Sequence, residues 1–114
     1  MSKTLVLAAV VVLAVGITGR TASAQSRNQL NIYWVDTEGG GATLIVSPSG
    51  ESALIDAGWE VDGRDAKRIF AVAQEAGLKK IDYFILTHYH PDHAGGLPAL
   101  AKLVPRSWRT ELGA

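Results

Sequence analysis

The chain has 114 residues, with 11 basic and 11 acidic side chains, three histidines and no cysteine. This length allows one small domain at most. Because there is no cysteine, disulfide bonds are excluded, and stability has to come from a modest hydrophobic core.

Residues 1–24 have the pattern of a secretory signal peptide. Lys3 stands near the start, an apolar run extends from Leu5 to Ile17, and Ala-Ser-Ala precedes Gln25. A basic start, an apolar core of about 7–15 residues and an A-x-A site define such a leader. An uncleaved membrane anchor would need about 20 apolar residues. We therefore expect an exported protein, periplasmic or secreted, with no membrane association after the leader is removed.

Cleavage after Ala24 would leave residues 25–114, a domain of 90 residues. Lys3 and Arg20 are lost with the leader, so nine basic residues remain against 11 acidic ones and the net charge becomes −2. Nucleic-acid-binding domains usually carry a basic face or stripe. The composition therefore gives no strong sign of a nucleic-acid partner.

Strand patterns fill the first half of this domain. Residues 30–35 alternate, with Leu30, Ile32 and Trp34 on one face, and two apolar runs follow at 42–46 and 53–55. Alternation of this kind is typical of a β-strand. Pro48 and Gly50 lie between the two runs and suit a hairpin turn. The three glycines at 39–41 lack the spacing of a phosphate-binding loop, and a strand follows them, so we predict a tight turn.

The pattern then changes to that of a helix. Apolar residues recur at steps of three and four between Gly63 and Gly77, which gives one apolar stripe. Asp62 is the expected N-cap and Gly77 the left-handed residue after the helix. A second, shorter helical pattern covers 97–104 and ends before Pro105.

Between these helices, residues 81–86 read Ile-Asp-Tyr-Phe-Ile-Leu, which is apolar on both faces apart from Asp82. A strand of this composition is usually covered on both sides, as inside a layered α/β sheet. We therefore expect a layered α/β fold.

All histidines of the chain lie in one loop, THYHPDHAGG, directly after this strand. His88, His90, Asp92 and His93 are ligand-type side chains, and imidazole with carboxylate suits zinc while tolerating iron or manganese. His88 and His90 can converge on one ion, and Asp92 with His93 can turn toward a second. The alternative is a polar surface loop that is rich in histidine by coincidence.

The motif HxHxDH in this loop resembles that of the metallo-β-lactamase fold superfamily. The sequence LIDAG at 54–58 is similar to the strand-end aspartate of that superfamily, and the segment 35–59 resembles the opening hairpin of its branch related to DNA-uptake competence proteins. The likeness extends over roughly 32–104. It implies the N-terminal half of an αββα sandwich, with a mixed sheet and flanking helices.

The resemblance also implies roles for individual residues. His88 and His90 would bind the first metal, and Asp92 and His93 the second, with Asp92 orienting the metal-bound water. Asp56 would support the ligands from outside the metal's own shell, although a turn-forming or helix-capping aspartate is an equal alternative. Thr87 is expected to shape the loop rather than to take part in catalysis.

The implied function is that of an exported zinc-dependent hydrolase. Zinc lowers the pKa of bound water to about 7, so that hydroxide is available at neutral pH. The motif resembles that of glyoxalase II-like thioesterases, lactonases, RNase Z-like phosphodiesterases and one subclass of β-lactamases. We therefore expect a small-molecule ester, thioester, lactam or lactone, or a phosphodiester, as the substrate. Nucleic-acid processing is the alternative that the hairpin likeness raises.

A third possibility is an inactive fragment. A catalytic zinc usually has three protein ligands, whereas His88 and His90 supply two, and no other histidine or cysteine is present to complete the set. The resemblance implies further ligands in a C-terminal half, and Glu111 is the only carboxylate after Asp92. We expect a truncated or frame-shifted product that has an exposed apolar sheet face and an incomplete active site.

Overall fold

The computed structural model describes residues 28–105, which form one four-stranded sheet with helices against it. The predicted leader, 1–24, and the tail after Pro105 lie outside the described residues. No helix within 28–105 has the length and apolar character needed to cross a bilayer.

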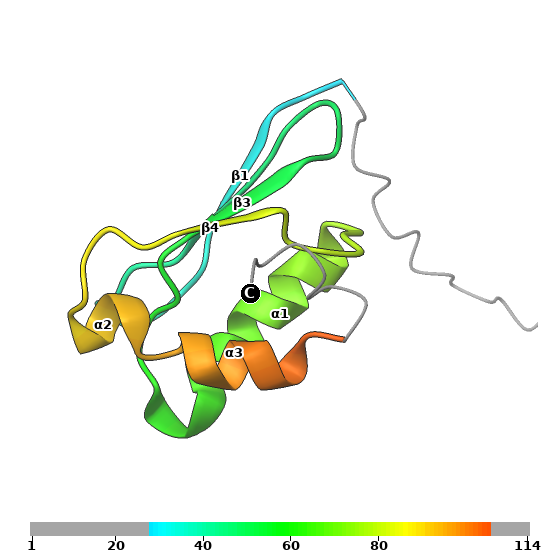
Figure 1. Ribbon diagram of the computed structural model, residues 1–114. Helices are drawn as coiled ribbons and strands as arrows, with labels where there is room; N and C mark the ends of the chain where they lie inside the picture. The colour runs from blue at the N-terminus through cyan, green and yellow to red at the C-terminus, as the bar shows by residue number, and fades with distance from the viewer. Residues whose placement is uncertain (1–27, 106–114) are drawn as a thin grey trace, which may run out of the picture.

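The sheet is mixed, as predicted, and its strands follow the order of the chain (Figure 1). The first three strands pair antiparallel and the last two pair parallel. The elements are β1 (Asn31–Trp34), β2 (Thr43–Val46), β3 (Ser52–Ile55), the 3-10 helix η1 (Val61–Gly63), α1 (Arg64–Glu75), β4 (Tyr83–Ile85), α2 (Pro91–Ala94) and α3 (Leu97–Leu103).

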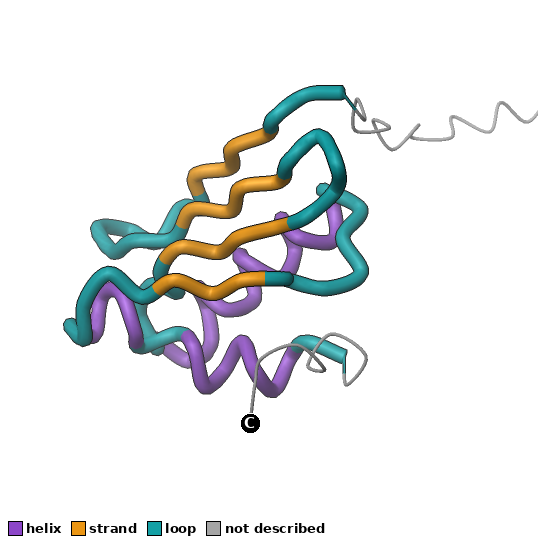
Figure 2. The backbone as a smooth tube through the Cα atoms, turned by 45° about the horizontal axis from the view of Figure 1, so that its top comes forward, coloured by secondary structure: helices purple, strands orange, loops and turns teal. Residues whose placement is uncertain are grey.

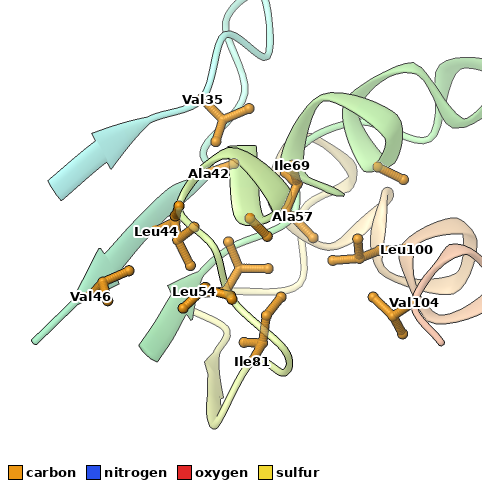
Figure 3. Packing of buried hydrophobic residues seen from close by; sticks show 14 residues of the cluster. Val35, Ala42, Leu44, Val46, Leu54, Ala57, Ile69, Ile81, Leu100 and Val104 are labelled. Carbon is orange, nitrogen blue, oxygen red and sulfur yellow. The ribbon is translucent and has the colours of Figure 1, made fainter. Parts of the chain in front are cut away.

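The helices α1 and α3 pack together behind one face of this sheet (Figure 2). Side chains of the sheet and of both helices meet there, and Leu44, Leu54, Ile69 and Leu100 are all buried (Figure 3). Burial of each large aliphatic side chain contributes about 1.5–3 kcal/mol relative to exposure. The core is therefore a single layer between the sheet and two helices.

The ends of α1 agree only in part with the prediction. Gly77 has φ 71, and the N–H groups of Gly77 and Leu78 donate to the carbonyls of Gln74 and Ala73 at 2.9 and 3.0 Å. This is a Schellman cap, as expected for glycine after a helix. The prediction for Asp62 was wrong, because Asp62 lies inside η1 with φ 50, and Gly63 takes the N-cap position of α1 without a side-chain cap.

The prediction that the strand at 81–86 is covered on both sides was also wrong. β4 is shorter and lies at the edge of the sheet, where Tyr83 and Ile85 are 57% and 49% exposed. An apolar sequence does not by itself show which face of the strand is buried and which is exposed. Among the described residues, the helices cover only the opposite face.

Two cross-strand rows make up the uncovered face, which we call the open face. One row pairs Ile32, Ile45, Ala53 and Tyr83, and the other pairs Trp34, Thr43, Ile55 and Ile85. Trp34 is 79% exposed. An apolar patch of this kind promotes association when it is left in water.

We predict that the open face drives self-association of the chain. The double substitution Ile32→Thr/Trp34→Thr keeps strand-forming residues but removes two large exposed apolar groups, so it should shift the sedimentation of concentrated protein toward monomer. Val61→Thr is the matched control, because Val61 is exposed and apolar but lies in η1. Equal association of both variants and the unmodified chain would contradict the prediction.

Asp82 fixes the start of β3 against the start of β4. Its Oδ2 accepts from the backbone N–H of Ser52 at 2.8 Å and its Oδ1 pairs with Lys80 Nζ at 2.9 Å. Burial alone would raise the pKa of Asp82, but the bonds from Lys80 and Ser52 outweigh it and lower the pKa below its ordinary value.

We predict that Asp82→Asn lowers the free energy of unfolding by about 1–3 kcal/mol at pH 7, since hydrogen bonds to a charged group are lost. The native pKa is lowered, so the stabilisation is present above the ordinary aspartate pKa and is lost as the pH falls through the native pKa. Urea unfolding across pH 2–7 measures this difference. Glu75→Gln, at an exposed carboxylate of α1, is the control.

Candidate metal centre

The histidine loop begins at the C-terminal end of β4, and its second half forms the short helix α2 (Figure 1). The sequence interpretation missed α2, although Pro91 at its first position is a known helix-start signal. The turn of α2 brings His93 back toward His88, and their ring centroids are 4.0 Å apart. The helical turn therefore brings together the histidine side chains that an extended loop would hold apart.

Among residues 28–105, one group of side chains could hold a metal ion, and it consists of His88, Asp92 and His93. Each offers one ligand atom, and the three atoms lie within 4.8 Å of one another. Two imidazoles and a carboxylate are a donor set that zinc accepts, as do iron and manganese. The residues present therefore fit a divalent transition metal.

His90 lies beside the three-donor group rather than within it. It precedes α2 as its N-cap residue and is exposed, and it does not belong to the three-donor group. Its ring is nevertheless close to that of His88, edge to face with centroids 4.7 Å apart. The structure thus brings His88 together with Asp92 and His93, with His90 alongside.

Asp56 lies beneath the group, at the C-terminal end of β3. Its Oδ2 is 2.7 Å from Nδ1 of His93 and accepts the hydroxyl proton of Thr87 at 2.8 Å, while Oδ1 accepts the backbone N–H of Thr87 at 2.8 Å. Asp56 is 4% exposed and contacts the histidine loop rather than capping a helix. A carboxylate in this position orients a ligand histidine.

The hydrogen bonds of Asp56 also determine its charge. Burial alone would raise the pKa of Asp56, but the bonds from the Thr87 backbone, His93 and the Thr87 hydroxyl outweigh it and lower the pKa below its ordinary value. Asp56 is therefore ionised at neutral pH and can only accept hydrogen bonds. His93 must donate from Nδ1, so the neutral ring carries its lone pair on Nε2, where a metal could bind.

Thr87 orients the ring of His88 in the same way as Asp56 orients that of His93. Its hydroxyl donates to Asp56, and its oxygen lies 3.0 Å from Nδ1 of His88. Since the one hydroxyl proton goes to Asp56, Nδ1 of His88 is the donor to Thr87, and Nε2 of His88 also keeps its lone pair. One buried carboxylate thus sets the tautomers of two histidines, one directly and one through a hydroxyl.

Gly40 and Gly41 have a role that the sequence did not reveal. The N–H of Gly41 donates to the carbonyl of Asp92 at 2.9 Å. A Cβ on Gly41 would come within 2.8 Å of Nδ1 of His93, and one on Gly40 within 2.5 Å of the Asp92 carbonyl oxygen. Only glycine allows the backbone to approach the histidine loop this closely.

The chain is similar to known proteins over this region. The model of the metallo-beta-lactamase superfamily matches residues 31–110. A hydroxyacylglutathione hydrolase of Stenotrophomonas maltophilia is 36% identical over 62 residues, which are 54% of this chain and 21% of that protein. A metal-dependent hydrolase of Cupriavidus metallidurans is 33% identical over 81 residues, which are 71% of this chain and 26% of that protein.

A metal-dependent hydrolase of Cupriavidus necator is 29% identical over 111 residues and matches 89% of this chain. The chain spans only 21% to 36% of the length of these three curated relatives. The superfamily resemblance read from the histidine motif is confirmed. The finer likeness of 35–59 to DNA-uptake proteins stays a prediction.

We predict that the Thr87 hydroxyl contributes to metal affinity. Thr87→Val removes the bridge between Asp56 and His88 without changing the size of the side chain, so the affinity for Zn²⁺ should fall about tenfold, as for other groups that orient metal ligands. Thr87→Ser keeps the hydroxyl and is the matched control. Competition with a chromophoric chelator measures both, and equal affinities for the two variants would contradict the role.

Proposed function

The chain belongs to the metallo-beta-lactamase superfamily, and we propose that it carries the metal centre of a metal-dependent hydrolase. The observation that supports this most directly is the three-donor group of His88, Asp92 and His93, with Asp56 oriented beneath it. We propose zinc as the metal, because two imidazoles and one carboxylate are common catalytic zinc ligands. Iron or manganese would suit the same donors.

In this proposal the side chains have separate tasks. His88, Asp92 and His93 hold an ion, and His90, whose ring lies beside that of His88, holds the same ion or a second one. A bound zinc ion supplies Lewis acidity and a nucleophile at neutral pH. Asp92 is partly exposed, so its carboxylate can also accept a hydrogen bond from the attacking water and orient it.

The proposed substrates are small molecules with an ester, thioester, lactone or lactam bond, or a phosphodiester. The relative named hydroxyacylglutathione hydrolase makes a thioester the first substrate class to test. We also propose that this chain by itself has little activity. His88, Asp92 and His93 supply three ligands for one ion, which leaves His90 alone for a second ion, and the sequence contains no fourth histidine and no cysteine.

We predict that the purified chain binds Zn²⁺, and that His88→Ala and His93→Ala each abolish most of this binding. Tyr89→Ala is the matched control, because Tyr89 lies within the motif but is 90% exposed. Metal content after dialysis and chelator competition measure binding, and hydrolysis of a thioester measures activity. Hydrolysis should be close to background. An unmodified chain without bound zinc would contradict the proposed metal centre.

We further propose that the protein is exported with its metal centre. The support is the basic start, apolar run and Ala-Ser-Ala site of residues 1–24. The exported protein should begin at Gln25, as measured by intact-mass spectrometry of the periplasmic or secreted fraction. Exported protein that retains Met1 would contradict this.

A further inference from the structure

The loop between β1 and β2, residues 36–41, forms one wall of the metal centre, and we call it the glycine loop. Its Gly41 N–H donates to the Asp92 carbonyl at 2.9 Å, and its Gly41 carbonyl accepts from Gly58 N–H at 2.8 Å. It therefore contacts both the histidine loop and the segment after Asp56. A movement of the glycine loop would release the backbone of Asp92.

Side chains of α1 also contact this loop. Arg64 donates from Nη1 to Glu38 Oε2 at 2.7 Å and from Nη2 to the Thr37 carbonyl at 3.3 Å. Arg68, one turn later, reaches the other oxygen of Glu38 at 3.1 Å and the Asp36 carbonyl at 2.8 Å. Glu38 has φ 51, a conformation that costs free energy for a residue other than glycine and that these contacts stabilise.

Arg64, unlike Arg68, also forms a hydrogen bond to a buried carboxylate. Its Nε donates at 2.7 Å to Oδ1 of Asp65, a carboxylate that is 0% exposed. Oδ2 of Asp65 accepts the backbone N–H of Trp59 at 2.8 Å. Asp65 and Arg64 thus connect the segment after Asp56 to the glycine loop through one fork of hydrogen bonds. Such a fork has the planar geometry that guanidinium provides and ammonium does not.

We propose that Arg64 is a positioning residue of the metal centre, which holds the glycine loop against Asp92 and His93 so that the ligands are ordered before a metal binds. The inference rests on the proposed function, since it assigns a role in metal capture. Arg64 itself touches none of the ligand side chains. It acts through Glu38, Thr37 and the Gly41 N–H.

The direction of the change in Zn²⁺ affinity separates a positioning role of Arg64 from a purely electrostatic role. A positive charge near a cation site repels the cation, so removal of the Arg64 charge alone would raise the affinity for Zn²⁺. If Arg64 orders the glycine loop, its removal lowers the affinity instead. Arg64→Lys keeps the charge but cannot reach Asp65, Glu38 and the Thr37 carbonyl together, so its effect reports geometry alone.

The test uses the full chain, with Zn²⁺ as the probe and chelator competition as the readout. Arg64→Gln and Arg64→Lys should each bind Zn²⁺ at least about tenfold more weakly, the range found for groups that orient metal ligands. Lys67→Gln is the matched control, because it removes a positive charge from an exposed residue of the same helix whose Nζ bonds to the Asp62 carbonyl and not to the glycine loop, and it should bind nearly as well as the unmodified chain. Amide exchange of Gly41 in metal-free protein should be faster in the Arg64 variants only.

An unchanged or higher Zn²⁺ affinity in the Arg64 variants would overturn the proposal, as would an equal loss in Lys67→Gln. If Arg64→Gln does not fold, Arg64→Lys and the Gly41 exchange rate decide. Failure of the unmodified chain to bind Zn²⁺ would overturn the proposed function together with this inference. Binding by the unmodified chain with no effect of Arg64 would overturn the inference alone.

Discussion

The candidate metal centre depends on one buried carboxylate, that of Asp56. The parallel pairing of β3 and β4 brings their C-terminal ends side by side, so Asp56 after β3 meets Thr87 after β4. Ligand sites commonly form at this end of parallel strands. Two oxygens on a short side chain receive the Thr87 N–H, the Thr87 hydroxyl and the His93 ring. Neither strand alone could arrange these groups.

The conformation of Asp56 is unfavourable in isolation. It has φ 60, which costs a non-glycine residue of the order of 1 kcal/mol, and its charge is buried. Its three accepted hydrogen bonds, together with its own N–H bond to the Ile85 carbonyl at 2.9 Å, offset these costs. Folding therefore sets the tautomers of His88 and His93 before a metal binds. A metal ion then has to order these side chains less on binding.

Features determined by neighbours in sequence were predictable, and those determined by distant contacts were not. The stripe of α1, the turn at Gly50 and the cap at Gly77 follow from residues a few positions apart. The contact of Asp56 with His93 joins residues 37 apart in sequence, so only the superfamily resemblance indicated it. The wrong predictions for Asp62 and for the burial of β4 have the same cause. Capping and burial depend on packing between distant parts of the chain, which a local sequence pattern does not contain.

The helix α1 connects the core to the candidate metal centre. Ile69 and Ala73 of its apolar stripe are buried under the sheet, while Arg64 and Arg68, four residues apart, share the face that holds Glu38. The rotation of α1 about its axis therefore sets both contacts at once. A smaller side chain at position 69 would let α1 shift against the sheet. This shift would displace Arg64 from Glu38 and Asp65. Core packing and the order of the glycine loop are consequently two results of the same helix placement.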